Sequence, residues 1–149
     1  MRIAVCSDEP YGIHEQLLGA LRELGHEVVA FGSIRSGGEE PWAAVAAEAA
    51  ESILRGDCDE GIFCCWTGTG IAMAANKLPG IRAALCTDAE TARGARIWNH
   101  ANVLALSNRL LGEHVLTEIL EAWFGTDPGD AGAEGVAALA ALDDRHRGG

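Results

Sequence analysis

Two adjacent cysteines followed at once by a glycine-spaced turn are the residues of this sequence best placed to do chemistry. The run Ile62 to Cys65 has the apolar composition of a strand buried on both faces of a parallel sheet. The turn Thr67-Gly68-Thr69-Gly70 follows, and Ile71 to Ala75 can open a helix whose first N–H groups point back at the turn. An anion or a developing oxyanion would bind there. The pattern predicts a functional loop, although the same strand, turn and helix occur in almost every α/β domain.

Cys65 is the better candidate of the two cysteines because it lies at the carboxyl end of the predicted strand. Neighbouring side chains of a strand point to opposite faces, so only one of the two thiols can look into the loop. The other packs beneath a helix as a small apolar group. We therefore predict that Cys65 is functional and that Cys64 is structural.

Strand-like runs alternate with helical patterns along the chain. The runs cover residues 2–6, 27–31, 61–65, 81–86 and 103–106, and a helical pattern follows each of them. This alternation predicts a parallel sheet covered on both faces, with any ligand at the carboxyl ends of the strands. Asp8, Cys65, Asp88 and Ser107 all emerge at that edge.

Length and composition predict a single domain. The 149 residues, 48% of them hydrophobic, supply one core and leave little room for a second. We expect the core to span residues 1–126, with a linker and a C-terminal helix over 127–149. The segment from Gly125 to Gly135 is rich in Gly, Asp and Pro, which predicts irregular structure, and a short helix is expected over 136–142.

Charge and cysteine usage narrow the class of protein. The net charge of −11 disfavours nucleic acid as a partner. Five cysteines, an odd number placed mostly in strand-like runs, indicate a reducing, cytoplasmic location rather than a disulfide framework. There is no CxxC and no histidine pair at helical spacing, so we expect neither a metal nor a cofactor. No leader pattern and no apolar run of about 18 residues is present, so export and membrane insertion are not expected.

Four segments carry a resemblance to a known family: SDE after the first strand, GHEV before the second, CWTGTGIAMAANKLPGIRAALCTD, and NHANVLALSNRLLG. Over residues 1–126 the sequence resembles the family of ribose-5-phosphate isomerase type B and galactose-6-phosphate isomerase. That family interconverts aldose and ketose sugar phosphates without a metal, by moving a proton between C1 and C2 through an enediolate. The resemblance implies a Rossmann-like three-layer α/β/α sandwich with a five-stranded parallel sheet, and a homodimer with shared active sites.

The resemblance gives roles to the residues around the glycine turn. Cys65 matches the base of the family's common branch, and Thr67 matches the polar loop residue beside it. The loop residues Gly68, Thr69 and Gly70 fall where N–H groups hold the enediolate oxygen and contact the substrate. Asp8 matches an aspartate that contacts sugar hydroxyls.

The resemblance also implies that two chains share each site. Asn99 and Arg109 match substrate-binding positions that the partner chain supplies. The family's phosphate-clamping pair of arginines falls in the segment from Gly125 to Gly135, which contains no arginine. Arg145 and Arg147 either fold back to replace that pair or belong to a solvated tail.

Three substitutions fall at positions that the family uses for ring opening and substrate contact. Glu9 and Trp98 stand where the family has histidines, and the histidine at the Trp98 position is the proton donor of ring opening. Trp66 stands where the family has a glycine. Glu9 is either a second acid or base at the substrate or a solvated turn residue. His100 either donates the proton in place of Trp98 or is an exposed loop histidine. Trp66 and Trp98 either present flat apolar faces to a sugar or pack at the dimer interface.

Two functions fit these observations. The first is an isomerase that moves a proton between C1 and C2 of a sugar other than ribose 5-phosphate, such as a shorter, unphosphorylated or uronate-type sugar. The second is an inactive family member that binds a sugar-like ligand. Retention of the glycine loop together with Cys65, Asp8 and Asn99 favours the first, because a binding scaffold alone does not need that set.

Overall fold

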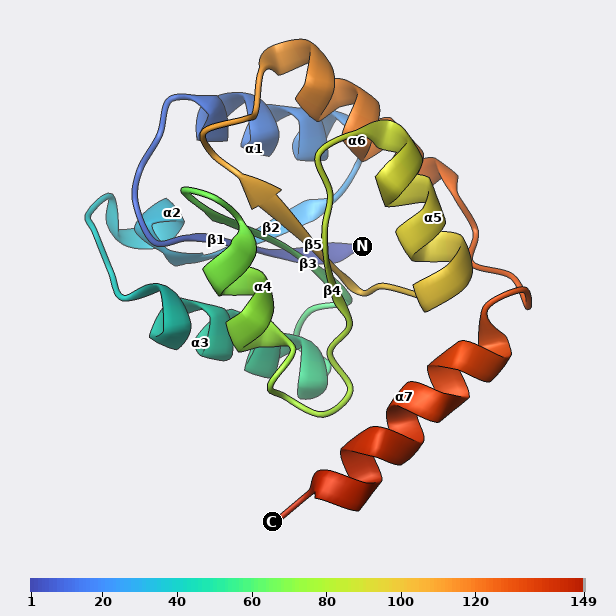
Figure 1. Ribbon diagram of the computed structural model, residues 1–149. Helices are drawn as coiled ribbons and strands as arrows, with labels where there is room; N and C mark the ends of the chain where they lie inside the picture. The colour runs from blue at the N-terminus through green and yellow to red at the C-terminus, as the bar shows by residue number, and fades with distance from the viewer. Residues whose placement is uncertain (149) are drawn as a thin grey trace.

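A parallel sheet of five strands runs through the computed structural model, which describes residues 1–148 (Figure 1). The strands are β1 (Arg2–Ser7), β2 (Glu27–Gly32), β3 (Glu60–Cys65), β4 (Ala83–Leu85) and β5 (Val103–Ser107). Their order is β2-β1-β3-β5-β4, and all neighbouring pairs are parallel, so the predicted fold is confirmed. The strand order reverses between β1 and β3, which is where open parallel sheets bind ligands.

Helices cover both faces of this sheet (Figure 1). They are α1 (Ile13–Glu23), α2 (Ser33–Ser36), α3 (Trp42–Leu54), α4 (Thr69–Ala75), α5 (Ala89–Asn99), α6 (Glu113–Gly125) and α7 (Ala133–His146). Helices α1, α5 and α6 pack on one face with Ile62 and Cys64, whereas α3 and α4 pack on the other with Phe63 and Cys65. The alternation along β3 therefore divides the core into two layers. No helix within residues 1–148 is long and apolar enough to span a bilayer.

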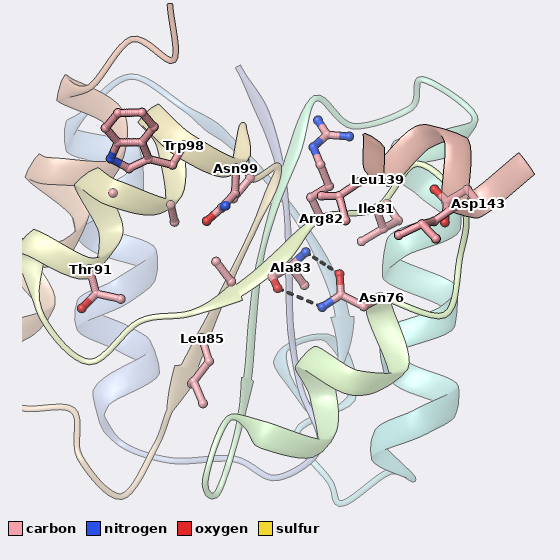
Figure 2. A pocket seen from close by; sticks show the side chains of 15 residues that line it. Asn76, Ile81, Arg82, Ala83, Leu85, Thr91, Trp98, Asn99, Leu139 and Asp143 are labelled. Carbon is pink, nitrogen blue, oxygen red and sulfur yellow. Dashed lines mark hydrogen bonds between the residues drawn. The ribbon is translucent and has the colours of Figure 1, made fainter. Parts of the chain in front are cut away.

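The edge strand β4 is shorter than the run predicted over 81–86. Within residues 1–148, β5 is the single strand that pairs with it, and at its start the Arg82 N–H donates to the Asn102 side chain at 2.8 Å. On the outward side, the Asn76 amide group binds both the N–H and the carbonyl of Ala83, at 2.7 and 2.9 Å (Figure 2). The Asn76 side chain thus occupies the N–H and the carbonyl of Ala83, with which a further strand would otherwise pair.

The C-terminal helix is longer than the sequence predicts. Helix α7 covers Ala133–His146 instead of 136–142, so the irregular segment ends before Gly135. Gly132, at its N-terminus, lies against backbone carbonyls in the last turn of α5, where a side-chain carbon would clash. This tertiary contact sets where the helix begins, and the local sequence pattern does not contain it.

Helix α7 contacts the rest of the chain near each of its ends. Gly132 packs on the end of α5, and the Asp143 carboxylate accepts a hydrogen bond from the Gly80 N–H at 3.0 Å. None of its residues is buried, and it extends away from the layers around the sheet (Figure 1). A helix of this length with no buried face gains little from the packing that normally stabilises helices.

A buried ion pair ties the amino end of the sheet to its helices. Glu60, the first residue of β3, accepts a hydrogen bond from Arg96 of α5, and both side chains are nearly enclosed. Arg96 also donates to the Ala101 carbonyl at 2.8 Å, and its guanidinium lies 4.8 Å from the centre of the Trp123 ring. Burial raises the pKa of Glu60, although Arg96 opposes that shift.

We predict that Arg96→Ala lowers the free energy of unfolding by about 3–5 kcal/mol, because it leaves Glu60 buried without its cation. Urea denaturation followed by circular dichroism measures the loss. Arg93→Ala is the matched control, since Arg93 pairs with Glu90 at the surface of the same helix and should change stability by less than about 1 kcal/mol. Equal stabilities of the two variants would contradict a structural role for the buried pair.

Candidate active site

Cys65 lies in a small cavity at the carboxyl edge of the sheet. The cavity has a volume of about 300 Å³ and is lined by Asp8, Trp42, Cys65, Trp66, Thr67, Thr69 and Gly70. The Gly68 N–H donates to the Cys65 sulfur at 3.2 Å. A hydrogen bond of this kind stabilises a thiolate, the form of cysteine that acts as a base or nucleophile.

The two cysteines of β3 face opposite ways, as the alternation of a strand predicts. Cys64 is fully buried on the other face of the sheet, in the cluster that contains Ile62 and Leu106. Burial raises the pKa of Cys64 to about 12, so it remains a thiol at neutral pH. Only Cys65 reaches the cavity.

Gly68 determines the shape of the loop that contacts Cys65. Its φ of 77° lies in the left-handed region, and a Cβ there would come within 2.5 Å of the Leu85 side chain and 3.0 Å of the Leu106 backbone. Only glycine avoids both penalties. On either side of Gly68, the hydroxyl groups of Thr67 and Thr69 are hydrogen-bonded to one another at 2.7 Å at the exposed mouth of the cavity.

Asp8 reaches the same cavity from the end of β1, the neighbour of β3. Partial burial and the charges of Glu9 and Glu39 raise the pKa of Asp8. One of its carboxylate oxygens is buried without a hydrogen-bond partner. Such an oxygen is free to accept a hydrogen bond from a bound hydroxyl group.

Trp42 lines the cavity as well, although nothing in the sequence pattern had identified it as a site residue. It is the first residue of α3, and a Cβ on Gly70 would come within 3.2 Å of its ring. The sequence contains one signal for it, because the segment after β2 must also lie at the carboxyl edge of a parallel sheet. The alanine-rich pattern that follows Pro41 gives no reason to single out this tryptophan.

Trp98, Asn99 and His100 do not meet Cys65 within one chain. They end α5 and precede β5, whose Val103 lies opposite Gly61, at the amino edge of the sheet. At roughly 3.3 Å per residue, β3 carries Cys65 about 13 Å from that edge. The prediction that these residues join the Cys65 site therefore requires a second chain.

Trp98 and Asn99 instead line a cavity of about 800 Å³ beside the edge strand (Figure 2). Leu139, Leu142 and Asp143 of α7 form its opposite wall. The His100 Nε2 atom is buried without a hydrogen-bond partner. The backbone there is unusual as well, since its φ of 44° is the single positive value among the non-glycine residues described, 1–148.

Arg109 lies at the same edge as Cys65 of its own chain. Its N–H donates to the Trp66 carbonyl at 3.1 Å, and the N–H of Asn108 donates to the Cys65 carbonyl at 2.9 Å. The resemblance implied that Arg109 reaches the partner's site, but the backbone places it beside its own. Arg145, at the end of α7, lines none of the described cavities. Within residues 1–148 no cluster of three His, Cys, Asp or Glu side chains is arranged to hold a metal ion.

Comparison with known proteins identifies the family. Residues 3–138 match the family model described as Ribose/Galactose Isomerase. The chain belongs to this family. It is 33% identical to ribose-5-phosphate isomerase B of Escherichia coli over 141 residues, which cover 94% of each chain. The structure of Clostridium thermocellum ribose-5-phosphate isomerase B superposes with a TM-score of 0.91 at 34% identity, covering 98% of this chain and 99% of that one. The resemblance found in the sequence is thereby confirmed.

Relatives within the family differ in the sugars for which they are named. The D-erythrulose-4-phosphate isomerase of Pectobacterium atrosepticum is 42% identical over 91 residues, or 60% of each chain. The family fold therefore accommodates more than one sugar skeleton, and membership alone does not fix the substrate.

Proposed function

We propose that the protein is an aldose–ketose isomerase in which Cys65 is the base. The observation that carries the proposal is the Gly68 N–H bound to the Cys65 sulfur inside the cavity at the switch between β1 and β3. The thiolate removes the proton from C2 of the aldose, the C2–H electron pair forms the C1–C2 double bond, and the C1=O π pair moves onto O1 to give the enediolate. A proton then passes from O2 to O1, the thiol returns its proton to C1, and the carbonyl is left at C2. The relatives named as sugar-phosphate isomerases support this reaction.

The glycine loop supports the oxygen that becomes negative during proton transfer. A preorganised donor at such an oxygen contributes about 3–4 kcal/mol to transition-state stabilisation. The loop from Thr67 to Gly70 supplies backbone N–H groups and two hydroxyl groups at the cavity mouth, while Asp8 accepts from the sugar hydroxyls. The base and the donors thus come from β3 and the loop that follows it, and the acceptor Asp8 comes from the end of the adjacent strand β1.

We propose further that the active unit is a homodimer. Trp98, Asn99 and His100 lie at the wrong edge to serve their own Cys65, and a partner chain can bring them there. The same region exposes apolar surface: Trp98 is 60% exposed, and Leu139 and Leu142 of α7 are more than 40% exposed. Burying such surface against a second copy is favourable, and symmetric dimers are the commonest assembly.

We predict that the enzyme prefers a neutral or singly charged sugar to ribose 5-phosphate. The segment from Gly125 to Gly135 carries no arginine, so the pair that clamps the phosphate in the family is missing there. Two lost charge-assisted hydrogen bonds cost roughly a hundredfold or more in affinity for the phosphate. The test is loss of the C2 proton in deuterated water, followed by NMR over C4 to C6 aldoses, their phosphates and their uronates. Removing residues 143–149 controls for the tail arginines. Efficient turnover of ribose 5-phosphate that disappears on truncation would show that the tail rebuilds the phosphate site and would refute this preference.

The alternative is a family member without catalysis that binds a sugar-like ligand. It predicts saturable binding of a sugar from the same panel with no proton exchange for any of them.

A further inference from the structure

Tyr11 links Trp66, a lining residue of the Cys65 cavity, to Glu9, which follows the lining residue Asp8 in the chain. Its ring stacks on Trp66, with ring centres 5.6 Å apart and planes inclined by 24°. Its hydroxyl group donates to the Glu9 carboxylate at 2.5 Å. The hydrogen bond to Glu9 raises the pKa of Tyr11 to about 12, so the phenol remains a donor at neutral pH. Trp66 is 51% exposed, so the stack provides much of what holds its indole.

A buried polar network fixes Tyr11 in turn. The Tyr11 N–H donates to His14 Nδ1 at 3.4 Å, and His14 Nε2 donates to the Asn108 side-chain oxygen at 2.9 Å. Asn108 donates to the Ser7 hydroxyl group at 3.3 Å, which donates to the Glu9 carbonyl at 2.7 Å. Burial lowers the pKa of His14, in keeping with the neutral imidazole that one accepting and one donating nitrogen require. The turn that presents Glu9 and Tyr11 is therefore anchored to the strand ends beside Cys65.

The charges near this wall are unfavourable for a phosphate. Glu9 and Glu39 both raise the pKa of Asp8, after burial. Arg109 brings one positive charge to this edge of the sheet, against the three carboxylates of Asp8, Glu9 and Glu39. Carboxylates accept hydrogen bonds but donate none, whereas a phosphate requires donors. A sugar hydroxyl group can donate to a carboxylate, and the carbon-bound hydrogens of a sugar can lie on an indole face.

We propose that Tyr11 is a positioning residue that sets the specificity of the Cys65 cavity. By stacking on Trp66 and binding Glu9, it holds an indole in the cavity wall and a carboxylate next to that wall. That wall selects a sugar whose end remote from the reacting carbons carries a hydroxyl group instead of a phosphate. The inference rests on the proposed isomerase function and adds the residue that determines which sugar is accepted.

A double-mutant cycle tests whether Tyr11 acts through Trp66. The substrate is the unphosphorylated aldose with the highest kcat/KM among D-erythrose and D-ribose. Tyr11→Leu should raise KM about tenfold and change kcat less than about threefold, because the wall contacts a non-reacting part of the sugar. Tyr11→Leu with Trp66→Leu should be no worse than Trp66→Leu alone. Additive losses, or a fall in kcat with KM unchanged, would overturn the proposal.

A second pair of variants tests the carboxylate while keeping the aromatic stack. Tyr11→Phe frees Glu9, and Glu9→Gln removes its charge. The readout is the ratio of kcat/KM for each aldose to that for its terminal phosphate. Glu9→Gln should shift this ratio toward the phosphate by about tenfold, and Tyr11→Phe should shift it in the same direction by less. A ratio that neither variant moves would refute the selection of a hydroxyl end, and thermal unfolding of each variant reports whether it is folded.

Failure of the isomerase proposal itself would look different. If the unmodified protein exchanged the C2 proton of no sugar, tryptophan fluorescence titration with the same sugars would still measure how tightly the wall binds them. Tyr11→Leu would then weaken sugar binding about tenfold, and unchanged binding would overturn the role of Tyr11.

Discussion

The Cys65→Ala variant is expected to lose exchange of the C2 proton by roughly a thousandfold, because a positioned general base contributes on that order to proton transfer. The sulfur of Cys65 faces the cavity and accepts the Gly68 N–H, so the substitution removes the base and leaves the donors in place. Exchange is measured by NMR in deuterated water with the sugar that the unmodified enzyme turns over fastest.

Cys64→Ala is the matched control for this variant. Cys64 is fully buried on the opposite face of the same strand, and its pKa of about 12 leaves it without a thiolate at neutral pH. We expect it to retain turnover and to lose very roughly 1 kcal/mol of stability through the deleted buried group. Equal loss of activity in the two variants would contradict the assignment of the base to Cys65.

The second large effect is recovery of activity when two inactive chains are mixed. Cys65→Ala destroys the part of the site at the carboxyl edge, whereas Asn99→Ala changes a residue at the amino edge, which the proposed dimer brings to its partner's cavity. After subunit exchange, half of the dimers are hybrids with one intact site of two, so about a quarter of full activity should return. Activity is measured after verified exchange of tagged subunits.

The control for complementation mixes Cys65→Ala with Asp8→Asn. Both residues line the same cavity of the same chain, so a hybrid dimer has no intact site and no recovery is expected. Arg109→Ala belongs with this control, because Arg109 lies beside its own Cys65. Recovery in the control mixture, or none with Asn99→Ala, would contradict a site shared as proposed.

The strand, glycine turn and short helix around Cys65 were predictable because their signals are local. Alternation along residues 62–65 separates the two cysteine side chains, and Gly68 stands where φ is positive. The parallel sheet followed from the alternation of strands and helices, and the family from motifs that survive in this chain.

The parts that could not be predicted depend on contacts distant in sequence. Trp42 reaches the cavity, and Tyr11 reaches Trp66, only when three loops meet at one edge, which no local pattern encodes. The position of His100, in contrast, was predictable from the topology. A helix that follows a parallel strand runs back to the amino edge of the sheet, so the residues after it lie far from the carboxyl ends of the strands. The length of α7 depended on the contact of Gly132 with α5.

The lack of any buried residue in α7 links subunit affinity to helix formation. An isolated helix of 14 residues is marginal in water, so ordering α7 costs free energy that packing within one chain does not offset. In the proposed dimer that cost is subtracted from the association free energy. Substitutions in α7 that change only helix propensity would therefore alter how tightly two chains associate, even at positions that touch neither the partner nor the sugar. Evolution could adjust assembly of this enzyme without changing a residue of its active site or of its subunit contact.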